Sequence, residues 1–244
     1  MDRPRLVLLN AAHEGGPTRR NFRRELDADL VEFHVTEGEL PPAVEGPGQP
    51  YDGLVVTGSR SSVYWDEAWI EPTKEWVSDA VDVGLPALGI CYGHQLLADV
   101  LGGTVEDMGE YEIGYRTIEH RGSGLFEGVP EEFLAFTTHS DAVTDLPAGA
   151  EPTAENDYGI HGFRKDRVFG VQFHPEYDAA TAERVTEGKE IDPERKQRVL
   201  DGITEENYRR ACEAKGVFGN FVDYVREVRA ADPEAATAEG TADD

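Results

Sequence analysis

The amino-acid sequence predicts an α/β fold in which a mostly parallel sheet is flanked by helices and extended by added antiparallel strands. Short apolar runs alternate with longer amphipathic runs through the first part of the chain, which is typical of successive βα units. The middle part, 104–171, is rich in Gly, Thr and aromatic residues in short alternating runs, which favours hairpins and a final strand at 171–173. From 179 onward the pattern is helical.

The first elements follow from the spacing of apolar residues. The apolar run after Arg5 predicts a short strand. A helix is expected over 17–30, because Phe22, Leu26 and Leu30 recur every four residues and share one face. The strands expected in this part lie at 5–10, 31–35 and 51–57.

The next unit contains a fully apolar strand between two helices. Its expected elements are a helix at 68–83, a strand at 85–90 and a helix at 92–101. Trp69, Trp76 and Ala80 lie on one stripe of the first helix, which indicates core packing. The pair Gly102-Gly103 ends the second helix. Together these elements describe a flavodoxin-like sheet.

The C-terminal part is predicted to be helical over 179–229, in three pieces that break near Pro193 and Gly202. The last piece has an apolar docking face, formed by Phe218, Phe221, Val222 and Val225. The acidic segment 230–244 lacks large apolar residues and is expected to be disordered. The predicted organisation is a single domain over 1–229, with a helical extension at 179–229 and a tail at 230–244.

The charge of the chain excludes several classes of partner. There are 23 Lys and Arg against 49 Asp and Glu, a formal net charge of −26, which disfavours nucleic acid and anionic membrane surfaces. With the excess of arginine over lysine, this indicates the surface of a protein from a high-salt cytoplasm, where exposed carboxylates are screened. An ordinary acidic protein is the alternative.

The sequence also bears on location. No apolar run has the length of a membrane span. The segment before Asn10 reads as a first strand rather than a signal peptide. The two cysteines, Cys91 and Cys212, cannot form a disulfide framework, which favours a reducing cytoplasm.

The residues Gly89-Ile90-Cys91-Tyr92-Gly93 form a G-x-C-x-G pattern where a buried strand meets a helix. This is the cysteine form of a nucleophile elbow. Glycines without Cβ atoms let the strand and the helix approach closely, and the N-terminus of a helix favours thiolate over thiol. The pattern therefore predicts Cys91 as a nucleophile, with a buried structural cysteine as the alternative. Cys212 lies inside an amphipathic helix and has no such setting.

A cysteine nucleophile needs a base and a group that orients the base. Pro175 biases His174 toward an extended backbone, so that His174 and Glu176 can face the same side and complete a Cys-His-Glu triad. His94 forms a C-x-x-H pattern with Cys91, but no second ligand pair accompanies it. We therefore expect no metal site and no cofactor.

A Gly/Ser loop, Thr57–Ser62, leaves the strand predicted at 51–57. In a parallel sheet this loop lies at the carboxyl edge beside the elbow. The backbone N–H groups near Gly58 and at Tyr92 are therefore expected to form an oxyanion hole. A phosphate cradle is the rival interpretation, but no G-K-[ST] follows the loop.

The motifs GICYGHQ and GVQFHPEY together resemble those of class I glutamine amidotransferases, the triad type. The resemblance covers about 6–177, and within the family the sequence is similar to stand-alone proteins related to the glutaminase part of GMP synthase. It implies that Cys91 attacks the glutamine side-chain amide, while His174 moves protons and Glu176 orients His174. Glutamate and ammonia then form through a γ-glutamyl thioester.

The same resemblance extends to substrate contacts. The segment FTTHSD, 136–141, is similar to the S-H-x-D loop of the family. It implies that Gln95 and the backbone around Ser140 and Asp141 contact the substrate, and that Gly58 and Tyr92 supply the oxyanion donors through their backbone N–H groups. One departure is that Gly58 is followed by Ser-Arg-Ser, where many relatives have Gly-Pro.

Three functions fit these residues. The first is a glutaminase that passes ammonia to a separate synthetase, since the chain has no S-G-G-x-D-S ATP-pyrophosphatase loop. The second is a γ-glutamyl peptidase or hydrolase that acts on γ-glutamyl peptides or conjugates with the same triad. The third is a non-catalytic binding module, which the intact triad disfavours. The helices after Tyr177 are expected to complete the fold, with covering the site or docking a partner as alternatives.

Overall fold

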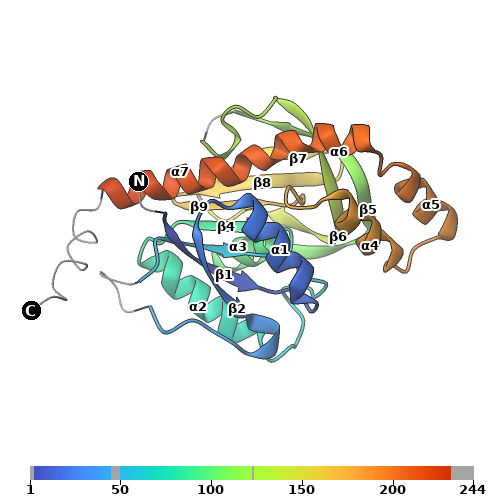
Figure 1. The fold of residues 1–244 in the computed structure, drawn as a ribbon. Coiled ribbons are helices and arrows are strands. Elements are labelled where there is room, and N and C mark those ends of the chain that lie inside the picture. Colours follow the sequence, from blue (N-terminus) through green and yellow to red (C-terminus); the bar gives the residue numbers. More distant parts are fainter. Residues whose placement is uncertain (1–2, 45–49, 123, 232–244) are drawn as a thin grey trace, which may run out of the picture.

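The computed structural model describes residues 3–44, 50–122 and 124–231. The strands form one sheet (Figure 1), and they are β1 (Arg5–Asn10), β2 (Asp29–His34), β3 (Gly53–Val56), β4 (Ala87–Ile90), β5 (Thr104–His120), β6 (Glu132–Asp145), β7 (Glu151–Asn156), β8 (Gly159–Lys165) and β9 (Val168–Val171). Their order in the sheet is β2-β1-β3-β4-β9-β8-β7-β5-β6. Neighbours from β2 to β9 in this order pair in parallel, and the remaining neighbours pair antiparallel. The predicted α/β class with added antiparallel strands is confirmed.

The helices lie on both faces of this sheet. They are α1 (Gly15–Glu25), α2 (Ile70–Asp82), α3 (Tyr92–Val100), α4 (Ala179–Glu187), α5 (Pro193–Asp201), α6 (Glu205–Ala211) and α7 (Gly216–Ala231), with short 3₁₀ turns η1 (Val35–Glu37), η2 (Gly124–Phe126) and η3 (Cys212–Lys215). Among the described residues, no helix has the length and apolar character needed to cross a membrane.

The predicted helix over 17–30 is wrong at its C-terminal end. The helix stops at Glu25, and Leu26 has an extended backbone with φ −95° and ψ 115°. Leu30 belongs to β2, where it pairs with Leu6 of β1. Tertiary pairing with β1 therefore overrides the four-residue spacing that had placed Leu30 on the helix.

The C-terminal helices are more numerous than the three predicted pieces. Breaks lie near Pro193 and Gly202 as expected, but a further helix, α7, begins at Gly216 after η3. The side chains of Asp178, Asp192 and Thr204 cap α4, α5 and α6 by accepting backbone N–H groups. The predicted tail starts too early, because α7 continues to Ala231; the rest of that segment lies outside the described residues.

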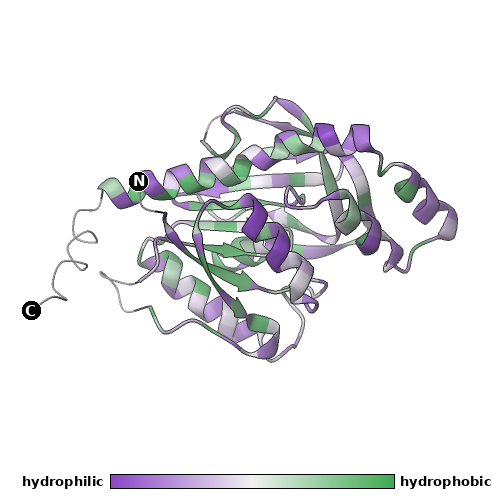
Figure 2. Cartoon of the chain, viewed as in Figure 1, coloured by the Kyte–Doolittle hydropathy of each residue, from purple (hydrophilic) through white to green (hydrophobic). Residues whose placement is uncertain are grey.

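Alternate residues of the central strands feed two separate apolar cores, one on each face of the sheet. Leu6 and Leu8 of β1 join the core that α7 covers, whereas Val7 and Leu9 join the core beneath α2 and α3. Figure 2 shows these strands as the most hydrophobic part of the fold. The apolar face predicted for the last helix is buried, because all four of its residues belong to the core that α7 covers. Thus α7 completes the fold, as expected.

Candidate active site

Cys91 lies at the turn between β4 and α3. Its backbone has φ 53° and ψ −102°, a conformation that residues other than glycine rarely adopt. The turn is held by its N–H, which donates to the Val171 carbonyl of β9 at 2.8 Å. The side chain is 4% exposed, and its Sγ lies 4.0 Å from the Thr138 carbonyl oxygen. A strained residue held this firmly is typical of a catalytic elbow.

Two glycines make this turn sterically possible. A Cβ on Gly89 would lie 2.2 Å from the Gly93 carbonyl oxygen, and a Cβ on Gly93 would lie 2.2 Å from the Val56 carbonyl oxygen. The strand β4, the helix α3 and the neighbouring strand β3 therefore touch backbone to backbone around Cys91. This is the physical reason for glycine on both sides of the nucleophile.

Replacing Gly93 with alanine is expected to lower the free energy of unfolding by about 2–3 kcal/mol, because the clashing atoms belong to the backbone of β3 and cannot rotate away. The matched control is Gly219→Ala in α7, where an added Cβ meets nothing within 4 Å. That control should raise stability by about 0.5–1 kcal/mol through helix propensity. Urea unfolding of both variants tests the pair, and equal effects would contradict this account of the elbow.

His174 and Glu176 form a buried pair beside the elbow. The Nδ1 of His174 lies 2.9 Å from Glu176 Oε1, and its backbone N–H donates to the Phe136 carbonyl at 2.8 Å. The ring of Tyr177 stacks on the imidazole, with centroids 4.1 Å apart and planes at 23°. Nε2 of His174 has no hydrogen-bond partner among the described residues. The ring is thus fixed on one side by Glu176 and free on the other.

The surroundings of His174 favour its charged form. Burial acts to lower the pKa of the imidazolium, but the charges of Glu176 and Cys91 outweigh burial and raise the pKa to about 10. At neutral pH the His174 ring is therefore protonated, and this imidazolium lies between Glu176 and the Cys91 sulfur.

Gly58 lies where the loop after β3 meets His174 and Cys91. A Cβ at this position would lie 2.9 Å from His174 Cε1 and 3.7 Å from Cys91 Cβ, so only glycine lets the loop approach both. Tyr92 is the first residue of α3, and the first N–H groups of a helix have no intrahelical partner. The two predicted oxyanion donors therefore come from segments that flank Cys91. The Tyr92 side chain is turned into the core, where it packs on Trp69.

The predicted substrate contacts lie deeper. Gln95 is 3% exposed, and its amide nitrogen donates to the Asp141 carbonyl at 2.9 Å and to Gln172 Oε1 at 3.0 Å. The Asp141 carboxylate accepts from the hydroxyls of Ser62 and Tyr64. These side chains are occupied by protein partners and do not line the pocket described next, nor does Ser140. In this structure they brace the end of β6 against the elbow.

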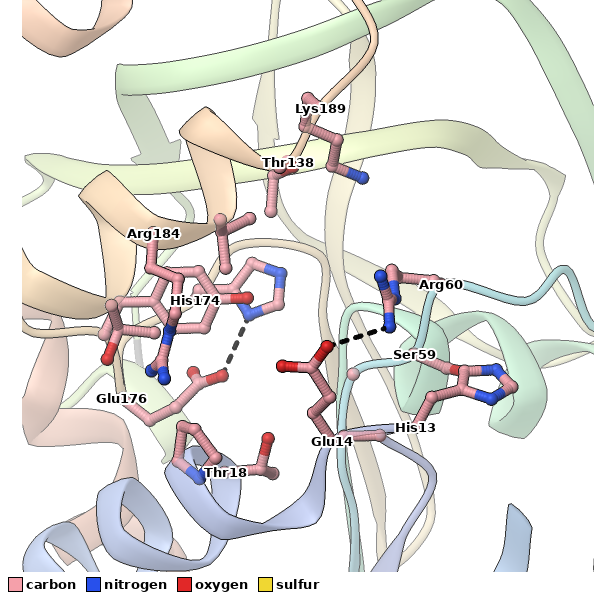
Figure 3. Close-up of a pocket in the computed structure, with 17 residues that line it drawn as sticks. His13, Glu14, Thr18, Ser59, Arg60, Thr138, His174, Glu176, Arg184 and Lys189 are labelled. Atoms are coloured by element: carbon pink, nitrogen blue, oxygen red, sulfur yellow. Dashed lines mark hydrogen bonds and ion pairs between the residues drawn. The ribbon is translucent and has the colours of Figure 1, made fainter.

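A pocket of about 270 Å³ opens onto His174, Glu176 and Gly58 (Figure 3). Its walls come from the N-terminal end of α1, the loop after β3, and the helix α4. The sequence left open whether the C-terminal helices cover the site. The structure places Thr181, Arg184 and Val185 of α4 in the pocket wall.

The pocket is more basic than the rest of this acidic chain. Arg60, Arg184 and Lys189 line it, and Arg60 is 3.6 Å from Glu14 across the opening. Lys189 lies 4.7 Å from the centroid of the Tyr111 ring, whereas Arg184 lines the pocket and has no carboxylate oxygen within 4.0 Å among the described residues. The cavity therefore presents net positive charge near His174, which attracts anions.

Sequence reasoning missed several of these residues. Thr138 contacts the Cys91 sulfur through its backbone carbonyl, and a backbone contact cannot be predicted from the type of residue. Arg184 and Lys189 reach the site from α4 and the residues just after it, and no motif placed that segment beside the triad. Tyr177 directly follows Glu176 in the HPEY motif, so its position beside His174 was open to inference.

His94, the partner of Cys91 in the C-x-x-H pattern, takes no part in the site. Its ring packs on Phe163, with ring centroids 5.1 Å apart, and burial lowers its pKa to about 3. A neutral imidazole held in the core in this way is a packing residue.

Comparison with known families gives a match to the family described as glutamine amidotransferase class-I, over residues 20–188. The chain is also 35% identical to the GMP synthase (glutamine-hydrolyzing) of Staphylococcus aureus strain MSSA476 over 178 residues, which are 70% of this chain and 30% of that protein. The chain thus spans less than a third of the length of that relative.

Two solved structures show the same fold. A glutamine amidotransferase from Thermotoga maritima has a TM-score of 0.73 at 24% identity, covering 91% of this chain and all (100%) of that one. A glutamine amidotransferase from Methylobacillus flagellatus has a TM-score of 0.72 at 22% identity, covering 91% of this chain and 95% of that one.

Proposed function

Because this chain belongs to the class I glutamine amidotransferase family, we propose that it hydrolyses the side-chain amide of glutamine to glutamate and ammonia through a thioester on Cys91. The observation that carries the proposal is the position of Cys91, on a positive-φ elbow beside the buried His174–Glu176 pair. A strained cysteine and an oriented imidazole are the two parts that acyl transfer by a thiol requires.

In the first half of the reaction, the Cys91 thiolate attacks the amide carbon, and negative charge develops on the former carbonyl oxygen. The N–H groups of Gly58 and Tyr92 stabilise that oxygen, each contributing about 3–4 kcal/mol by analogy with other oxyanion donors. His174 then donates its proton to the amide nitrogen, the C–N bond breaks, and ammonia leaves. The product on the enzyme is a γ-glutamyl thioester.

In the second half, His174 takes a proton from water, which attacks the thioester. The C–S bond breaks, glutamate is released, and the Cys91–His174 pair is restored. Glu176 holds the imidazole through Nδ1 in both halves, so that Nε2 always faces the reacting atoms. Gln95, Ser140 and Asp141 act on the substrate through the backbone that they brace rather than through free side chains.

The fate of the ammonia is part of the proposal. The 178 residues that match the Staphylococcus aureus GMP synthase make up 30% of that protein, so the relative is more than three times as long as the matched segment. From the net charge of −26 we infer a protein of a high-salt cytoplasm. We also infer that a separate synthetase takes up the ammonia released here. A glutaminase rate that rises when such a synthetase is added would support this inference.

The test combines turnover with labelling. Glutamine is supplied at high salt and ammonia release is measured, before and after treatment with a glutamine-mimicking diazoketone. We expect inactivation together with one covalent adduct on Cys91, located by peptide mass spectrometry. The half-buried Cys212 is an internal control, and an adduct on Cys212 alone would overturn the proposal.

A second candidate function is hydrolysis of γ-glutamyl peptides or conjugates by the same triad. The specific observation in its favour is the unneutralised positive charge of Arg184 in the pocket wall. A dipeptide such as γ-glutamylglycine carries a carboxylate on its leaving group, whereas the leaving group of glutamine is neutral ammonia. Higher kcat/KM for the dipeptide than for glutamine would favour this function over the first.

Replacing Arg184 with glutamine distinguishes the two functions further. If Arg184 binds a leaving-group carboxylate, kcat/KM for γ-glutamylglycine should fall about tenfold, the cost of one hydrogen bond to a charged group. The rate with γ-glutamylpropylamide, which lacks that carboxylate, should not change. Arg198→Gln is the matched control, because Arg198 is likewise a last-turn arginine, on α5 and outside the pocket. An equal loss of kcat/KM on both substrates would mean that Arg184 binds the α-carboxylate of the γ-glutamyl group, which both share, and not the leaving group.

A further inference from the structure

Three residues with metal-binding side chains meet in the interior of the fold, and none of the three lines the pocket. Glu112 of β5, His139 of β6 and His161 of β8 offer ligand atoms that all lie within 4.8 Å of one another. Their exposed fractions are 0%, 6% and 1%. The three strands are far apart in sequence, which is why the spacing of the motifs predicted no metal.

One carboxylate oxygen lies at the centre of the cluster. Glu112 Oε2 is 2.6 Å from His139 Nε2 and 3.0 Å from His161 Nε2. The other oxygen, Oε1, accepts a hydrogen bond from Asn156 Nδ2 at 2.7 Å. The carboxylate is therefore oriented from behind, with one oxygen directed toward both imidazoles.

The histidines are arranged as ligands are. His139 Nδ1 lies 2.9 Å from the Asp141 carbonyl, which can only accept, so Nδ1 carries a proton and Nε2 is the ring nitrogen that faces Glu112. Within the described part of the chain, neither ring nitrogen of His161 has an aligned hydrogen bond, although the ring is buried. The buried ring of His94 also lacks a hydrogen-bond partner but packs on Phe163, whereas Nε2 of His161 faces a carboxylate oxygen at 3.0 Å.

We propose that Glu112, His139 and His161 bind one divalent transition-metal ion, for which Zn²⁺ is the probe. Two imidazoles and one carboxylate are a known donor set for such ions. The Asp141 carbonyl behind His139 and the Asn156 amide behind Glu112 are the outer partners that fix metal ligands in orientation. Tetrahedral zinc at ordinary bond lengths separates its ligand atoms by about 3.4 Å, so the cluster has to open only slightly.

The ion would fix the strand that contacts the nucleophile. His139 follows Thr138, whose carbonyl faces Cys91 Sγ, and its ring contacts the same Asp141 carbonyl that Gln95 binds. Because the cluster is closed to solvent, the ion supplies structure and not a reactive water. The rival explanation is an imidazolium–carboxylate pair that holds only protons.

The test measures retained metal and does not depend on glutamine turnover. The chain is treated with chelator, mixed with zinc chloride, desalted in molar salt to remove cations bound weakly to the acidic surface, and analysed by elemental mass spectrometry. We expect about one zinc per chain and a melting temperature raised by zinc. A chain that retains no zinc overturns the proposal, whatever the variants do.

Variants locate the ion. Glu112→Gln and His161→Asn should each retain about tenfold less zinc or lower still, and zinc should no longer raise their melting temperatures. His120→Asn is the matched control, because His120 is also buried but bonds only to the backbone of Val129 and Gly122. Zinc retention that is unchanged in both cluster variants would place the ion elsewhere and refute the assignment.

Discussion

Replacing Cys91 with alanine is expected to lower kcat for glutamine hydrolysis by about 10⁴-fold or more, the scale seen when a nucleophile of covalent catalysis is removed. The thioester cannot form without sulfur, and the remaining oxyanion donors act only on direct attack by water. Ammonia release under saturating glutamine measures the loss. Because alanine keeps a Cβ, the backbone strain at this position is unchanged and the fold should be retained.

The control for this variant is Cys212→Ala. Cys212 begins η3 and is half-buried, far along the chain from the triad, so its replacement should leave the rate within about twofold, as for substitutions that cost under 0.5 kcal/mol. Circular dichroism of both variants establishes that they are folded. Turnover by Cys91→Ala close to the wild-type rate would remove the thioester mechanism.

Replacing Glu176 with glutamine is expected to reduce kcat by about 10⁴-fold, as for loss of the orienting carboxylate in other triads. It should also change the pH profile. The charge of Glu176 helps to raise the pKa of His174 to about 10, so the alkaline limb of kcat/KM should lie near that pH in the wild type. In the variant this limb should move to lower pH. If the alkaline limb stays at the same pH in the variant, deprotonation of His174 is not its cause.

The same substitution has a consequence for stability. The pKa of His174 is raised from 6.5 to about 10 on folding. Its charge therefore stabilises the folded state fully below the unfolded value of 6.5, and this contribution is lost as the pH rises through about 10. In Glu176→Gln that dependence should flatten. Urea unfolding at several pH values between these limits measures the difference.

Local pattern predicted the turn at Cys91 and the pairing of His174 with Glu176, because each depends on residues that are close in sequence; their catalytic roles stay predictions. The elbow depends on strand, turn and helix in immediate succession, and the glycines around Cys91 made that succession visible. The HPEY segment likewise carries His174 and Glu176 two residues apart. The structure places His174 and Glu176 beside Cys91, because β9 lies next to β4 in the sheet.

Sequence patterns did not predict features that depend on contacts between strands distant in sequence. Leu30 fits the periodicity of a helix, yet pairing with β1 makes it part of a strand. The Glu112 cluster joins the antiparallel strands β5, β6 and β8. The spacing of its three members in the sequence matches no metal-binding motif. Gln95 donates to the Asp141 carbonyl and to Gln172, partners that residue type alone does not reveal, and its contact with substrate stays a prediction.

The place of β9 in the sheet has a consequence for how the chain folds. It enters between β4 and β8, after all other strands have been made, and its Val171 carbonyl holds the backbone of Cys91. Pairings between segments so distant in sequence are slow to form, because chain entropy is lost before contacts repay it. The nucleophile is synthesised long before its base, and the two meet only when the sheet closes. Catalytic activity should therefore return in refolding with the slowest sheet-forming phase and not before it.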